Sequence, residues 1–165
     1  MKENKLIDLN AKVKSLKISS QERSDEDVEM YVGFKIGDEE YGIDIMIIKE
    51  IIRKVDITIV PNSPEYVEGV ANLRGEVIPL LDLRKKFNMK VKKRGKEART
   101  IVVEIEGKST GISVDKVTQV IKIPQNKINV PPQTATSIRK DFIKNVGRLP
   151  GRLILILDIV KIISS

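Results

Sequence analysis

The chain contains two copies of one sequence pattern, and this repeat constrains the fold more than any other feature. Residues 66–84 (YVEGVANLRGEVIPLLDLR) align without a gap with residues 142–160 (FIKNVGRLPGRLILILDIV). Upstream of them, residues 36–45 (IGDEEYGIDI) align in the same way with residues 105–114 (IEGKSTGISV). Because both pairs of segments occur in the same order, we interpret them as an internal duplication.

Each copy of the repeat has the pattern of a small β unit. The upstream segments consist of two alternating apolar runs around a polar turn that contains Gly, which is typical of a β-hairpin. Residues 47–53 and 117–123 predict a third strand, and a final strand pair surrounds Gly75 or Gly151. Ile and Val, which favour strands, fill 42 of the 165 positions. We therefore expect a mostly β fold of two five-stranded barrels, because barrel closure hides strand edges.

The composition excludes most kinds of catalytic site. The chain has no Cys and no His, which removes disulfides, thiolate nucleophiles, Ser-His-Asp triads and His-based metal sites. No glycine-rich phosphate loop is present. A hydrolase built on two carboxylates, with Asp82 or Glu50, is an alternative that requires the two acids to converge in a cleft. Asp82 and Asp158 occupy equivalent repeat positions, where we expect helix N-caps or turn residues instead. We expect no enzymatic activity, no cofactor and no metal.

The net charge of +7 comes from one segment. Residues 84–99 carry nine Lys and Arg against Glu97 alone, a net of +8, so the remaining residues sum to −1. A solvated connection is the plain interpretation. The alternative is a nucleic-acid or anionic-surface binding module, although Phe87 is the only aromatic residue in the segment.

The first 27 residues form a separate segment. Leu6, Leu9, Val13 and Leu16 have helix-like spacing with lysines between them. Because a short isolated amphipathic segment is marginally stable, we expect a flexible tail over residues 1–27, with a helix docked on the core as the alternative. The chain shows no membrane-spanning run and no secretory signal, so we expect a cytoplasmic protein.

Several motifs resemble the CheW family of chemotaxis coupling proteins. The strongest is residues 69–83 (GVANLRGEVIPLLDL), supported by residues 34–43, 49–51, 111–117 and 155–158. The resemblance extends over residues 28–163. It implies two SH3-like barrels with short helical connections.

The resemblance also predicts how the chain is divided. We expect the flexible tail over residues 1–27 and a CheW-like domain over residues 28–163. Within it, residues 28–83 and the C-terminal strands would form one barrel and residues 99–163 the other, with residues 84–98 as a basic connection.

The resemblance further implies a function without catalysis. Members of this family bridge the cytoplasmic tips of chemoreceptors to the regulatory domain of the histidine kinase CheA. They are cytoplasmic and are recruited to membrane-associated receptor arrays, with no membrane insertion and no nucleic-acid partner. By matched motif, five residues correspond to positions tied to receptor and kinase binding: Ile48, Glu50, Gly69, Arg74 and Gly75.

The residues themselves allow other roles at four of these positions. Arg74 suits a planar, multi-donor contact with a partner; the alternatives are that it solvates its turn, or that it pairs with a local acid such as Glu76. Glu50 binds a partner or marks the solvent face of its strand. Gly69 provides a positive φ angle. The sequence leaves Ile48 open between a core residue and an exposed contact.

Overall fold

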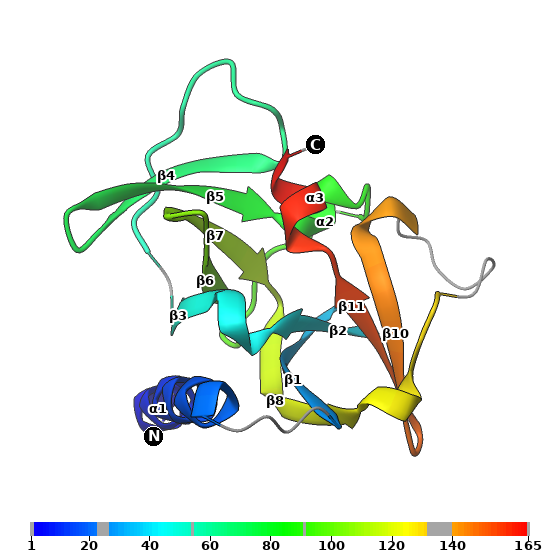
Figure 1. Ribbon diagram of the computed structural model, residues 1–165. Helices are drawn as coiled ribbons and strands as arrows, with labels where there is room; N and C mark the ends of the chain where they lie inside the picture. Colours follow the sequence, from blue (N-terminus) through cyan, green and yellow to red (C-terminus); the bar gives the residue numbers. More distant parts are fainter. Residues whose placement is uncertain (1, 23–26, 54, 91, 132–139, 165) are drawn as a thin grey trace.

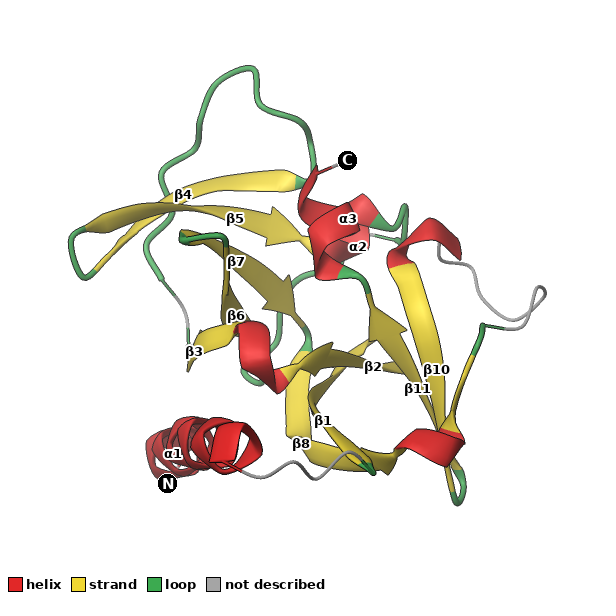
Figure 2. Ribbon diagram, in the orientation of Figure 1, coloured by secondary structure: helices red, strands yellow, loops and turns green. Residues whose placement is uncertain are grey.

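Two β-sheets make up most of the protein, and short helices follow several of their strands (Figure 1; Figure 2). The structure is a computed structural model and describes residues 2–22, 27–53, 55–90, 92–131 and 140–164. The six-stranded sheet has the order β8 (Lys116–Pro124), β1 (Val28–Ile36), β2 (Glu39–Asp44), β11 (Arg152–Leu157), β10 (Ile143–Leu149) and β9 (Ile128–Asn129). The five-stranded sheet has the order β3 (Ile48–Ile52), β6 (Arg99–Ile105), β7 (Lys108–Val114), β5 (Glu76–Asp82) and β4 (Val67–Leu73).

The helices are short, apart from the first. They are α1 (Lys2–Glu22), η1 (Ile45–Ile47), α2 (Leu83–Lys86), η2 (Gln125–Lys127), η3 (Lys140–Phe142) and α3 (Ile159–Ser164). This mostly β architecture confirms the predicted fold class, and the two sheets are consistent with SH3-like barrels. The short β9 is the one strand beyond the predicted five per barrel.

The two copies of the repeat exchange strands between the sheets. The order β8-β1-β2-β11-β10 corresponds, position for position, to β3-β6-β7-β5-β4 in the other sheet. Each sheet therefore combines the first hairpin of one copy with the third strand and last hairpin of the other. The predicted division, with residues 99–163 forming one barrel, is wrong because β6 and β7 belong with β3, β4 and β5.

Parallel strand pairs join the two copies at equivalent places. β2 pairs in parallel with β11, with Tyr41 opposite Leu155, and β7 pairs in parallel with β5, with Ile112 opposite Leu81. All other strand pairs in the two sheets of the described chain are antiparallel. Since parallel strands need a long crossover, these two pairs form only because distant segments of the chain meet.

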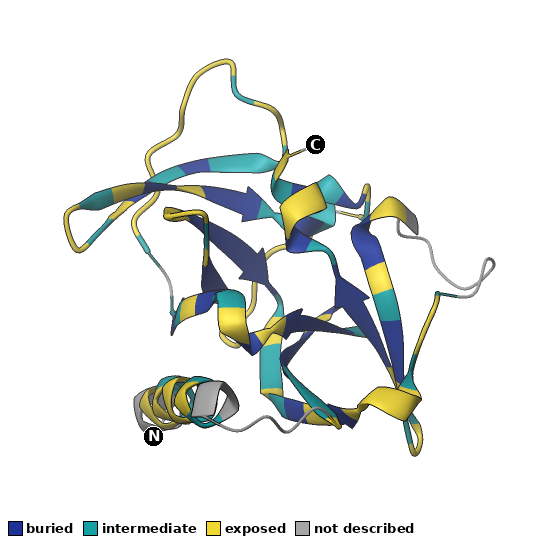
Figure 3. Cartoon of the chain, in the orientation of Figure 1, coloured by how far each residue is buried: buried dark blue, intermediate teal, exposed yellow. Residues whose placement is uncertain are grey.

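Three clusters of buried apolar side chains hold the sheets together. Figure 3 shows that buried residues lie along most of the strands. One lies within the six-stranded sheet and includes Ile121, Ile123 and Ile154. A second lies within the five-stranded sheet and includes Ile78, Leu80 and Val102. The largest draws on both sheets, so the two barrels share a core and we expect them to unfold together. It contains a row of ring contacts formed by Phe34, Tyr41, Phe87 and Phe142.

The N-terminal segment is a helix packed on an edge strand, which corrects the expected tail for residues 2–22 (Figure 1). The Asn10 side chain donates to the Ile51 carbonyl of β3 and accepts from the Ile51 amide, both at 2.8 Å. Lys17 donates to the carbonyl of Ile48, and Val13 is buried. Because β3 lies at the edge of its sheet, these side chains satisfy backbone groups that would otherwise lack a partner strand.

The two repeat-equivalent aspartates cap helices, as the sequence predicted. Asp82 accepts hydrogen bonds from the backbone amides of Arg84 (2.9 Å) and Lys85 (3.4 Å) at the start of α2. Asp158 accepts one from the amide of Lys161 (3.1 Å) in α3. These carboxylates satisfy the orphan amides of a first helical turn, and their role is structural.

Candidate partner-binding site

Two of the residues singled out by motif form an ion pair on the five-stranded sheet. The Nη2 atom of Arg74 lies 2.6 Å from Oε1 of Glu50. Glu50 lies in β3, and Arg74 lies in the turn between β4 and β5. The Arg74 side chain is 77% exposed while that of Glu50 is 21% exposed. The pair therefore leaves most of the guanidinium in solvent, available to a further acceptor.

The β4–β5 turn holds Arg74 in an uncommon backbone conformation. Leu73 and Glu76 pair across the hairpin, so Arg74 and Gly75 form a two-residue loop with φ angles of 53° and 84°. Two positive φ angles are typical of a type I′ turn, which favours Asn-Gly or Gly-Gly. The amide of Gly75 also donates to Oδ1 of Asn72 at 3.1 Å. Arg74 thus occupies a position that costs an arginine about 1–2 kcal/mol.

The equivalent turn of the second copy shows that the fold does not require this strain. There the loop between Leu149 and Arg152 is Pro150-Gly151, and Gly151 has a φ of 70°. Proline fixes φ near −65°, so the first loop position of that hairpin is not left-handed. The same hairpin is therefore built without a left-handed residue at its first loop position. The β6–β7 turn, in contrast, has the same conformation as the Arg74 turn, with Glu106 and Gly107 at φ angles of 52° and 77°.

A lysine network that the motif comparison missed extends this site. Nζ of Lys49 lies 3.2 Å from Glu76, 3.4 Å from Glu104 and 3.3 Å from the Ser109 hydroxyl. Hydrogen bonds to Glu76 and Glu104 raise the pKa of Lys49. Glu76 therefore pairs with Lys49, and the alternative in which it pairs with Arg74 is wrong. Lys49 could have been considered from the sequence, because it directly precedes Glu50.

The charged pairs surround a small pocket of about 240 Å³. Its lining combines Glu50, Arg74 and Lys49 with the apolar side chains of Leu73 and Ile78. A charged rim around an apolar floor suits contact with another protein. Glu50 has a cationic partner here, and Asp82 caps α2, so the structure does not bring these two acids together for hydrolysis.

Gly69 has a structural role at a β-bulge. The register of β4 against β5 shifts between Val67 and Gly69, and Gly69 has a φ of 148°. A Cβ atom there would lie 2.3 Å from the Thr58 carbonyl oxygen, because residue 58 pairs with Val70 beside it. The chain needs glycine at this close approach, which confirms the positive φ expected at this position.

Ile48 is a core residue, which corrects its prediction as a partner contact. Its side chain is 1% exposed and belongs to the shared core. A register shift between Ile48 and Glu50 of β3 against β6 is the reason. This β-bulge breaks the alternation of faces along the strand. The alternation of odd and even positions in the sequence therefore could not show which face Ile48 lies on.

The basic segment of residues 84–99 is partly tied to the fold. Arg84 pairs with Asp115 through Nε at 3.0 Å and through Nη2, and Arg94 pairs with Glu68. The Nζ atom of Lys86 lies over the ring of Tyr66, 3.7 Å from the ring centroid. Phe87 is buried in the shared core, so it offers no stacking surface for a nucleic-acid base.

Asp115 is held by two elements at once. Burial alone raises the pKa of Asp115, but hydrogen bonds from Arg84 and from the Gly37 amide outweigh it and lower the pKa below its usual range. This half-buried ion pair links α2 to the bend between β7 and β8, and the Gly37 amide joins that bend to the β1–β2 turn.

Within the described ranges, no helix is long and apolar enough to span a membrane. In the same residues, no cluster of three or more Asp or Glu side chains could hold a metal ion.

Fold and site together define a class of two-barrel domain with a charged surface pocket. Comparisons with known proteins place the chain within that class. The family model described as a CheW-like domain matches residues 30–165. The chain is 38% identical over 162 residues to "Chemotaxis protein CheW" of Helicobacter pylori, covering 98% of both proteins. It is 38% identical over 138 residues to the Treponema pallidum protein of the same name, covering 81% of each.

A solved structure agrees with this assignment. The scaffolding protein TtCheW from Thermoanaerobacter tengcongensis superposes with a TM-score of 0.77 and 36% identity. The match covers 83% of this chain and 93% of that protein. The chain belongs to the CheW family of chemotaxis scaffold proteins.

Proposed function

We propose that the chain is a non-enzymatic adaptor that couples chemoreceptors to the histidine kinase CheA. It would bind the cytoplasmic tips of the receptors and the regulatory domain of the kinase, and so be recruited from the cytoplasm to membrane-associated receptor arrays. The family assignment supports the scaffold role.

The observation that carries the proposal is the Glu50–Arg74 pair. An exposed arginine in a strained turn, fixed by a half-buried glutamate, is a preorganised donor on a rigid sheet. Preorganisation lowers the entropic cost of binding, and arginine is enriched among residues that dominate interface energies. The pocket of about 240 Å³ beside it would take an apolar side chain of the partner.

The other residues of the motif have supporting roles in this proposal. Gly75 allows the turn that presents Arg74, and Gly69 lets the segment around Thr58 approach β4. Ile48 belongs to the core and would act only by holding β3 in place.

An NMR titration tests the proposal. The isotope-labelled chain receives a chemoreceptor tip fragment, the CheA regulatory domain or a short DNA duplex in three separate samples. We expect shifts around Glu50, Arg74 and Gly75 with at least one protein partner. Absence of shifts with both proteins would contradict the coupling function.

A matched pair of variants makes the test specific. Arg74→Glu should weaken binding of the affected partner about tenfold or more, which corresponds to about 1.4 kcal/mol. Arg148→Glu makes the same charge change at an exposed position of the equivalent hairpin. It should leave binding within about twofold, and equal losses in the two variants would show that only net charge matters.

The DNA sample separates the alternative function. Binding through residues 84–99 would give shifts confined to that segment and a steep salt dependence. The burial of Phe87 and the ion pairs of Arg84 and Arg94 do not favour this alternative. The proposal expects no DNA binding.

A further inference from the structure

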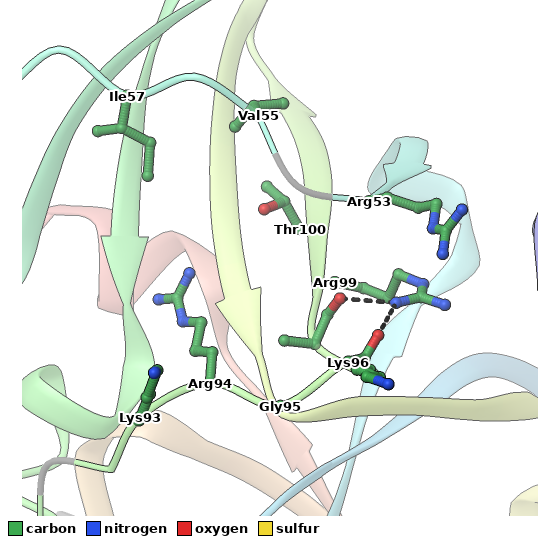
Figure 4. Close-up of a pocket in the computed structure, with 10 residues that line it drawn as sticks. Arg53, Val55, Ile57, Lys93, Arg94, Gly95, Lys96, Arg99 and Thr100 are labelled. Atoms are coloured by element: carbon green, nitrogen blue, oxygen red, sulfur yellow. Dashed lines mark hydrogen bonds between the residues drawn. The ribbon is translucent and has the colours of Figure 1, made fainter.

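A second pocket lies away from the Glu50–Arg74 site and is lined by cations. It has a volume of about 760 Å³, within the range typical of ligand sites. The segment after β3 forms one wall, with Val55 and Ile57, and the loop that leads into β6 forms the other (Figure 4). The basic residues that line it are Arg53, Lys93, Arg94, Lys96 and Arg99, and no acidic residue of the described chain lines it.

The cations in this basic pocket differ in whether a carboxylate of the described residues neutralises them. Arg94 is neutralised, because its guanidinium pairs with Glu68 and lies 3.6 Å from Asp82. Among the described residues, Arg99 donates to the backbone carbonyls of Lys96 (3.0 Å) and Ala98 (2.8 Å) and pairs with no carboxylate, so its charge remains.

The two lysines of the pocket are the most available cations. Lys93 and Lys96 are exposed, and neither has a carboxylate partner among the described residues. Their ammonium groups therefore remain free to pair with a ligand.

The arrangement of the charges indicates an elongated ligand. Figure 4 shows Lys93 and Arg94 at one end of the pocket and Arg53, Lys96 and Arg99 at the other. Val55 and Thr100 lie between the two groups, and Ile57 lies near the end with Lys93 and Arg94 (Figure 4). A compact inorganic anion would meet only one group and leave the apolar wall in water.

The wall composition also distinguishes between macromolecules. Proteins that bind single-stranded nucleic acids without sequence preference use aromatic stacking along a basic groove. Among the described residues that line this pocket none is aromatic, and the lining surface is mostly apolar. A peptide with an apolar side chain flanked by carboxylates matches both features.

We propose that this basic pocket binds an acidic peptide segment of a partner protein. One apolar side chain of the peptide packs against Val55 and Ile57, and carboxylates on either side pair with Lys93 and Lys96. The proposal is independent of the Glu50–Arg74 site, since the two pockets share no lining residue.

Fluorescence anisotropy with a defined probe tests this. The probe is a labelled hexapeptide, Asp-Glu-Leu-Leu-Glu-Asp, added to the full chain at low salt. Two further peptides replace the leucines by serine or the acids by their amides. We expect the parent peptide to bind and each replacement to weaken binding about tenfold, since both charge and apolar contact contribute.

Matched variants assign the binding to the pocket. The double variant Lys93→Gln with Lys96→Gln should weaken binding about tenfold. Lys90→Gln with Lys92→Gln removes the same charge from exposed positions of the same segment that do not line the pocket. That control should change binding less than about threefold.

The apolar wall has its own pair of variants. Ile57→Ser should weaken binding of the probe peptide. Ile59→Ser, at a 79% exposed position that does not line the pocket, should leave this binding unchanged.

Three results would overturn the proposal. The first is no binding of the parent peptide. The second is equal weakening by the two lysine double variants, which would mean diffuse charge attraction. The third is tighter binding of a DNA duplex or of phosphatidylglycerol vesicles, lost in the Lys93 and Lys96 variant, which would assign the pocket to another class of ligand.

Discussion

The docking of α1 gives a quantitative prediction for Asn10. Its side chain makes two hydrogen bonds of 2.8 Å to the backbone of Ile51 at the edge of the five-stranded sheet. Each such bond contributes about 1 kcal/mol net, so Asn10→Ala removes about 2 kcal/mol. Alanine is a better helix former than asparagine by about 0.6 kcal/mol. The variant should therefore lose about 1.5 kcal/mol of unfolding free energy.

Urea denaturation followed by circular dichroism measures this change. For a chain of 165 residues, about 1.5 kcal/mol also lowers Tm by about 3–6 °C. Hydrogen exchange adds a local readout, because the Ile51 amide donates to Asn10 and should exchange faster in the variant. Lys14→Ala, at an exposed position of α1, is the control and should stay within about 0.5 kcal/mol. Unchanged stability together with unchanged exchange at Ile51 would refute the docking of α1.

Three further predictions concern the fold around the site. Gly69→Ala should lower the free energy of unfolding by about 2 kcal/mol or more, because the new Cβ atom would meet the Thr58 carbonyl. Gly75→Ala should lower it by about 1 kcal/mol, since a Cβ atom there meets no atom within 4 Å and only the φ of 84° is unfavourable. Equal losses in urea denaturation would contradict this difference. Ile48→Ala should cost about 2–5 kcal/mol by the same assay, as expected for a 1% exposed core residue, and a cost under about 1 kcal/mol would place it outside the core. The pKa of Asp115 is lower in the folded chain than in the unfolded chain, so its stabilising contribution is complete above about pH 4 and is lost as the pH falls through the folded value. In Asp115→Asn the free energy of unfolding should decrease less steeply as the pH falls below about 4. The same pH dependence in the variant and the parent would show that this carboxylate does not contribute.

The repeat predicted the strands but not their partners. Residues 36–45 and 105–114 read as hairpins, and both form hairpins in the structure. Alternation of apolar residues indicates which face of a strand is buried. It does not indicate which other strand pairs with that strand. Because the two copies are equivalent in pattern, exchanged and unexchanged arrangements satisfy the sequence equally well.

The errors at α1 and Ile48 have a common physical origin. In both places a long-range contact overrides the local pattern. The polar side chain of Asn10 replaces a partner strand for Ile51, which helical periodicity does not reveal. The β-bulge in β3 rotates Ile48 into the core, and a bulge is set by pairing with β6.

The candidate site could be proposed from the sequence because a motif and a turn signal coincide. The Arg74-Gly75 dipeptide predicted an exposed turn, and the structure has one. The partnership of Arg74 with Glu50 joins residues 24 positions apart in the chain. No spacing rule for a single strand or helix connects them, so only the assembled sheet brings them together.

A bridging assay tests the central claim most directly. Beads that carry a chemoreceptor tip fragment are mixed with the CheA regulatory domain, with and without the chain. The account predicts that kinase domain is retained only when the chain is present, and that Arg74→Glu reduces the retained amount at least about fivefold while Arg148→Glu does not. Retention that is independent of the chain, or equal retention with the two variants, would contradict the account.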